Sequence, residues 1–131
     1  MELNKLTQEQ LYAELRTYLG VLSPEALQRI VQAPFESWTI GTYQNGTRRC
    51  LVGHACYAAN GLWGISHQQE VRDTRAYQRC TGHQRWVPTE LFDHTAQQCG
   101  LYETVEWLRG QAQQLLRPAT PDAPKETEAI T

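Results

Sequence analysis

Three residues that could do chemistry lie at helical spacing near the middle of the chain. Cys50, His54 and Tyr57 stand at positions i, i+4 and i+7, which places them on one face of a helix. A thiol in the first turn of a helix lies near the positive end of the helix dipole, which favours its thiolate form. The imidazole could take up the thiol proton, and a carboxylate such as Asp93 could orient that imidazole. The spacing therefore permits a thiol-dependent enzyme that uses Cys50, His54 and Asp93; alternatively, the thiol and a hydrogen-bonded histidine simply pack in the interior.

Two of these residues also belong to a candidate set of zinc ligands. Cys50 and His54 form one closely spaced pair, and Cys80 and His83 form another. Together they supply the four nitrogen and sulfur ligands that tetrahedral zinc prefers. Neither pair has the commoner Cys-x2-Cys spacing, and the second pair lies in a polar stretch. A structural zinc site is therefore a second hypothesis for the same residues.

A local excess of arginine follows this segment. Between residues 48 and 85 the chain has six arginines and only two acids. If residues 66–80 form a helix, three of the arginines share one of its faces, at i, i+3 and i+7. Arginine mixed with aromatic side chains is typical of protein interfaces and of grooves for single-stranded nucleic acid, but it also occurs on plain solvated surfaces. The predicted partner-binding residues are Arg72, Arg75, Arg79, Arg85 and Trp86.

Helices are predicted around these residues from capping signals and from apolar residues at helical period. Clear periodicity follows Thr7, which forms a predicted capping box with Gln10, and it follows Ser23-Pro24, Pro88 and Gly100. The nearly continuous apolar run over residues 50–59 suits a central helix packed on several sides, with a buried strand over residues 50–53 as the alternative. Ser66 and Gln69 form a second predicted capping box, which opens the arginine-bearing helix.

The predicted fold class is mainly α, a small bundle of four to five helices. Residues 38–49 are rich in β-formers and run into Asn45-Gly46, which predicts a short β-hairpin near this segment. Residues 1–117 are expected to form a single helical domain. Residues 118–131 contain three prolines and no apolar period, which predicts a flexible C-terminal tail.

Composition and targeting signals indicate a cytoplasmic protein. The formal net charge is −2, so no overall field draws the chain to nucleic acid or to acidic membrane. Residues 1–20 carry several charges and lack the uninterrupted apolar run of a secretory signal. In the cytoplasm the four cysteines are expected to be reduced thiols or metal ligands.

Short motifs in residues 38–116 carry a resemblance. Cys50 and Gly53 open an alanine-rich segment, Phe92-Asp93 follows, and an amphipathic stretch runs over residues 105–112. These elements resemble a family of small, uncharacterised bacterial and phage helical proteins with a Cys-x-x-Gly helix motif and a Phe-Asn-Asp turn. The chain departs from that pattern at Arg49, at His54 and in lacking the asparagine before Asp93. The resemblance implies a helical fold and a phage or mobile-element origin, but no chemistry.

The function expected from these patterns is stoichiometric binding of a protein partner, for example as an anti-defence inhibitor of a bacterial enzyme. The chain has no glycine-rich phosphate loop, no metalloprotease helix motif and no carboxylates paired at a spacing useful for catalysis. The first alternative is the thiol-dependent enzyme that uses Cys50 and His54. The second is a nucleic-acid-binding module, for which residues 96–108 only partly match a helix-turn-helix.

Overall fold

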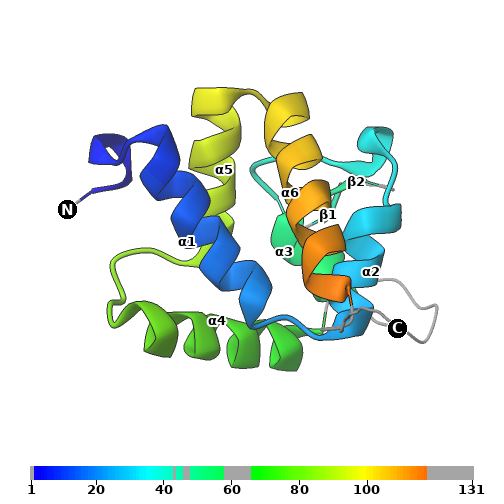
Figure 1. Cartoon of the computed structure of the whole chain (residues 1–131), viewed down its shortest axis with the longest axis horizontal. Coiled ribbons are helices and arrows are strands. Elements are labelled where there is room, and N and C mark those ends of the chain that lie inside the picture. The colour runs from blue at the N-terminus through cyan, green and yellow to red at the C-terminus, as the bar shows by residue number, and fades with distance from the viewer. Residues whose placement is uncertain (1, 43, 46–47, 58–65, 118–131) are drawn as a thin grey trace, which may run out of the picture.

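The computed structural model describes residues 2–42, 44–45, 48–57 and 66–117. Within these ranges the chain is mainly helical, as the sequence predicts (Figure 1). Five of the described α-helices have nine residues or more, and the remaining one, α3, has five. Two single-turn 3₁₀-helices (η) and two short strands complete the described elements. In chain order they are η1 (Leu3–Lys5), α1 (Gln8–Gly20), α2 (Pro24–Gln32), η2 (Phe35–Ser37), β1 (Gln44–Asn45), β2 (Arg48–Arg49), α3 (Leu51–Ala55), α4 (His67–Thr81), α5 (Pro88–Cys99) and α6 (Leu101–Leu116).

Short-range capping interactions set the start of the first two long helices. The Thr7 side chain accepts a hydrogen bond from the Gln10 amide (3.1 Å), and the Gln10 side chain accepts one from the Thr7 amide (2.8 Å). This is the reciprocal box that the sequence predicts. Ser23 caps α2, and Pro24 occupies its first turn, where the missing proline N–H costs nothing.

The predicted capping box at the start of α4 is only half formed. The Ser66 side chain accepts from the Gln69 amide (3.3 Å), but the Gln69 side chain does not return the bond. Its amide donates instead to Asp73 (2.7 Å), one turn further along the helix. Asp73 is buried, and its two oxygens accept from different donors, one from Gln69 and the other from the Cys56 thiol (3.9 Å), as buried carboxylates require.

One hydrophobic core joins the six described α-helices. Helix α1 packs against α5, α4 and α6, while α2 packs against α6 and α3. Helix α4 lies along one side of the molecule, at the bottom of Figure 1, and buries only Asp73 and Tyr77. The largest fully buried side chains are Tyr18, Tyr77, Phe92, Leu11, Leu15, Leu19, Ile30, Leu51, Leu91, Leu108, Val52 and Val105.

The central apolar segment is interior but is not the ten-residue helix predicted over residues 50–59. Of the described part of this segment, residues 50–57, only Leu51–Ala55 is helical, and all five of these residues are buried. A longer helix would use the carbonyls of His54 and Ala55 for its own i→i+4 hydrogen bonds. Here the Arg29 guanidinium of α2 donates to both carbonyls, at 3.1 and 2.9 Å. A tertiary contact therefore satisfies the carbonyl groups at the end of α3, and the local sequence does not predict it.

The β structure lies where the sequence predicts a hairpin. Gln44 pairs with Arg49 and Asn45 with Arg48 in an antiparallel ladder. The Thr39 amide also donates to the Arg49 carbonyl (2.9 Å), so β2 is held from both sides directly before α3. The predicted C-terminal tail, residues 118–131, lies outside the described residues. In the described part of the chain, no helix combines the length and apolar character needed to cross a membrane.

Candidate functional site

The outer face of α4 carries the arginines that the sequence singles out. The inner face of the helix carries Asp73 and Tyr77, which are both buried. Arg72, Arg75 and Arg79 are exposed, as expected for a face opposite to the buried one. The predicted helical register of the three arginines is therefore correct.

The surface beside these arginines is hollowed. A pocket of about 460 Å³ is lined by Arg75, Gln78, Arg79, Gly82, His83 and Gln84. A second pocket of about 370 Å³ shares two of those residues and extends toward α5, where Val87 lines it together with Val71 of α4. Both valines are notably exposed, at 46% for Val71 and 38% for Val87. This surface thus combines cationic, amide and apolar groups. We call it the α4 face and define it by the residues Arg72, Arg75, Arg79, Val71 and Val87.

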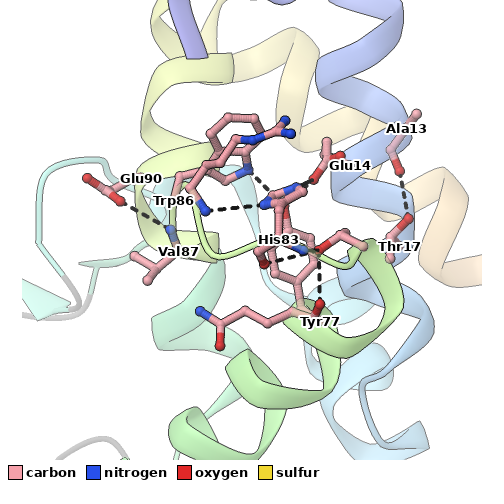
Figure 2. A network of polar contacts seen from close by, with 11 residues as sticks. Ala13, Glu14, Thr17, Tyr77, His83, Trp86, Val87 and Glu90 are labelled. Atoms are coloured by element: carbon pink, nitrogen blue, oxygen red, sulfur yellow. Dashed lines mark hydrogen bonds and ion pairs between the residues drawn. The ribbon is translucent and has the colours of Figure 1, made fainter. Parts of the chain in front are cut away.

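A partly buried polar network fixes the α4 face on the rest of the protein (Figure 2). The Tyr77 hydroxyl donates to the Glu14 carboxylate of α1 and accepts from the Trp86 indole N–H (2.8 Å). His83 Nε2 lies 3.3 Å from the same Glu14 carboxylate. Burial is the main cause that raises the pKa of Tyr77, so the hydroxyl keeps its proton and can donate. The network positions His83 in the wall of the larger pocket.

Trp86 does not belong to the exposed contact surface, contrary to the prediction. Only 4% of its surface is exposed, because the indole packs inside and its N–H is used by Tyr77. Arg85, its neighbour, is exposed as predicted. Three further residues belong to this surface that sequence analysis did not assign to it: Val71, Val87 and His83. The pocket forms where a helix meets the next loop, and the hydrophobic periodicity of either segment does not reveal it.

The environment of Cys50 contradicts the thiolate expectation. Cys50 is the N-cap of α3, not a residue of its first turn, and its Sγ accepts a hydrogen bond from the Gly53 amide (3.4 Å). The side chain is fully buried, and this burial is the main reason that its pKa rises to about 11. Desolvation of the charged form exceeds the favourable bonds at the helix start. Cys50 is therefore a neutral capping thiol near neutral pH.

His54 is held as a neutral imidazole by a contact with Ser37. Its Nε2 lies 2.9 Å from the Ser37 carbonyl, and because a carbonyl only accepts, Nε2 carries the ring proton. The ring also packs against Trp38, with 4.4 Å between the ring centroids. Burial is the main cause that lowers the pKa of His54 to about 4. The His54 amide donates to the Cys50 carbonyl (2.9 Å), but among the described residues no hydrogen bond joins the imidazole to the Cys50 thiol.

Asp93 and Tyr57 do not complete the predicted constellation. One Asp93 oxygen accepts from the Gly41 amide (3.0 Å), and the other is buried without a hydrogen-bond partner, so the carboxylate does not orient His54. Tyr57 lies beyond the end of α3, and its ring sits under the Arg49 guanidinium at 4.1 Å. The catalytic arrangement predicted from Cys50, His54 and Asp93 is therefore not assembled in this structure.

The four predicted zinc ligands are not gathered at one point. Cys80 is exposed on α4, and His83 faces Glu14 and the aromatic rings of Tyr77 and Trp86. Cys50 and His54 remain beside α3. Within the described ranges, no group of three or more His, Cys, Asp or Glu side chains is arranged to hold a metal ion.

Comparison with protein-family models, curated proteins and solved structures finds no match for this chain. The motif resemblance noted in the sequence therefore remains a prediction. The helix-turn-helix alternative has a structural objection, since Gly100 alone separates α5 from α6, whereas that motif uses a turn of three to four residues. Of the predicted site residues, the three arginines Arg72, Arg75 and Arg79 do lie together on one exposed helix face.

Proposed function

We propose that this protein binds a partner protein through the α4 face. The observation that carries the proposal is the exposure of three arginines on one face of α4, beside a pocket lined by the exposed Val71 and Val87. Guanidinium groups pair with carboxylates through a rigid planar fork, and they are enriched where interfaces concentrate their binding energy. The face therefore suits an acidic surface that also presents an apolar side chain.

The expected partner is a cytoplasmic protein whose carboxylates oppose the arginines. An apolar side chain of that partner could enter between Val71 and Val87, where burial would add to the electrostatic contacts. Such binding is stoichiometric and requires no reactive group. Inhibition of a bacterial defence enzyme by a phage or mobile-element protein is one role of this kind.

A nucleic-acid backbone is the competing anionic partner for the same arginines. Three arginines contact few phosphates, and the formal net charge of −2 adds no long-range attraction. The exposed valines are useful to a protein partner and not to a phosphate backbone. These features favour the protein.

The proposal is tested by charge reversal with a matched control. We expect the variant Arg72→Glu, Arg75→Glu, Arg79→Glu to lose a partner that the wild-type protein captures from its native host, with enrichment in mass spectrometry falling about tenfold or more. The control is Lys5→Glu, Arg48→Glu, Arg117→Glu, which changes the net charge equally at exposed residues outside α4. The control should still capture the partner.

Both variants should melt close to the wild-type temperature, since exposed side chains contribute little to stability. Equal capture by the wild type and the α4 variant would refute the proposal. A nucleic-acid function would show instead as binding of oligonucleotides by the purified protein, with an affinity that falls steeply as salt rises.

A further inference from the structure

A separate small cavity lies at the end of α2, beside α3. It measures about 270 Å³ and is lined by residues of α2, η2, β2 and α3, among them Arg29, Ser37, Arg49, His54 and Tyr57. None of these residues belongs to the α4 face. The cavity exists because the end of α2, the strand β2 and the short helix α3 converge at one point. Residues far apart in the sequence thereby share one small concave surface.

The charge of this cavity is positive and is not neutralised by its lining. Arg29 and Arg49 contribute two guanidinium groups, and no carboxylate is present among the described residues that line the cavity. His54 is neutral near pH 7, and both arginines contribute to keeping its pKa low, after burial. Two cations that share a confined surface without an anion favour the binding of an anion.

The arginines are held in place but retain free donors. Arg29 uses Nε and one terminal nitrogen to bind the carbonyls of His54 and Ala55, which leaves the other terminal nitrogen without a described partner. The Arg49 guanidinium is stacked on the Tyr57 ring at 4.1 Å. Its Nε is buried and has no hydrogen-bond partner. A buried unpaired donor is unfavourable, and a small shift of the Arg49 side chain would let an oxygen of a bound anion satisfy it.

The rest of the lining is suited to a carbon skeleton. Ala33 and Pro34, at the end of α2, line the cavity together with the Tyr57 ring. His54 Nε2 already donates to the Ser37 carbonyl, and the Ser37 hydroxyl lies 2.7 Å from the Pro34 carbonyl, to which it donates. These two polar groups are thus satisfied within the protein. The charged donors that remain for a ligand are the guanidinium groups.

We propose that this cavity binds a small organic molecule through an oxyanion group held between Arg29 and Arg49, with its apolar part against Ala33, Pro34 and the Tyr57 ring. Phosphate esters and carboxylates share the oxygen chemistry that guanidinium recognises. The proposal is independent of partner binding by α4. It assigns a ligand site to residues for which the sequence indicated none.

The test uses three probes at constant ionic strength: inorganic phosphate, phenyl phosphate and benzoate. Isothermal titration calorimetry of the full chain should show saturable binding of phenyl phosphate or benzoate, and the tighter of the two identifies the oxyanion as phosphate ester or carboxylate. The variant Arg49→Gln should weaken that binding about tenfold or more. The control Arg48→Gln alters the exposed neighbour in the same strand and should leave the affinity unchanged.

A second measurement needs no variant, so it can still test the proposal if Arg49→Gln fails to fold. A bound anion offsets the two arginines, so the His54 pKa, followed by NMR of its ring, should rise in the presence of the tighter probe. The absence of saturable binding by all three probes would overturn the proposal, as would equal weakening in Arg49→Gln and Arg48→Gln. Equal affinity for phenyl and inorganic phosphate would contradict the role given to the apolar wall.

Discussion

At the scale of single residues, burial decides the chemistry of Cys50 and His54. The thiol has its pKa raised to about 11 and the imidazole has its pKa lowered to about 4, in both cases mainly by removal from water. Both shifts favour the neutral form. A thiolate–imidazolium pair would need the opposite shifts. These two residues therefore act here as an N-cap and as a packed hydrogen-bond donor to Ser37.

The shifted pKa of His54 predicts how stability depends on pH. The unfolded chain binds this proton below about pH 6.5, whereas the folded protein binds it only near pH 4. The free energy of unfolding should therefore fall as pH drops through this window, by about 3 kcal/mol in total from this one group. Urea denaturation at several pH values, compared with His54→Asn, measures the contribution of His54.

The comparison with His54→Asn is needed because Asp73 and Asp93 have raised pKa values, mainly through burial. Their protonation stabilises the folded state at low pH and so opposes the effect of His54. They are present in both proteins, and their contribution cancels in the difference. Parallel pH profiles for wild type and variant would show that the His54 pKa is not depressed.

At the scale of elements, α4 depends on a small number of contacts for its position. Helix α1 is the element with which it shares its main contacts, and the network around Tyr77 ties α1, α4 and the loop before α5 together (Figure 2). Few contacts make a helix sensitive to the loss of any one of them. The geometry of the α4 face is therefore set by residues on its hidden side.

The variant Tyr77→Phe tests this dependence. It keeps the ring but removes the hydroxyl, which leaves the Trp86 N–H without its acceptor and leaves Glu14 with His83 as its remaining side-chain partner in this network. We expect a loss of about 1–3 kcal/mol in the free energy of unfolding, because the buried Trp86 N–H loses its acceptor. The control Tyr102→Phe removes a hydroxyl from a ring that is 57% exposed and should change little. Equal stability of the two variants in urea would show that the network is dispensable.

At the scale of the whole molecule, a single core draws on every described α-helix. Helix α6 illustrates its role, since it packs against α1, α2 and α5 and ties the first half of the chain to the second. Its apolar residues are not equivalent, because one side of the helix faces the core and the other faces solvent. Stability is therefore a property of the assembly and not of any one helix.

Two leucines of α6 provide a direct comparison. Leu108 is fully buried and Leu115 is 46% exposed. We expect Leu108→Ala to lower the free energy of unfolding by about 2–5 kcal/mol, through lost burial and the cavity left behind. Leu115→Ala should cost about 0.5 kcal/mol or less. Denaturant curves of the two variants check this, and similar losses would mean that the described packing of α6 is wrong.

The sequence alone determined those features that depend on neighbours along the chain. The box of Thr7 and Gln10, the start of α2 at Ser23 and Pro24, and the shared face of Arg72, Arg75 and Arg79 are set by contacts over three to seven residues. Helical period and capping chemistry are local properties, so they can be recognised without a structure. The mainly helical class follows from the same signals.

Tertiary structure alone decided the features that depend on burial and on distant partners. Arg29 satisfies the end of α3 from twenty-five residues away, Trp86 turns inward to reach Tyr77, and His54 finds Ser37 in place of Cys50. Desolvation and hydrogen bonding across the fold depend on which segments meet, and residue type and spacing do not specify that. For the same reason the paired arginines of the small cavity, Arg29 and Arg49, became neighbours only when the chain folded.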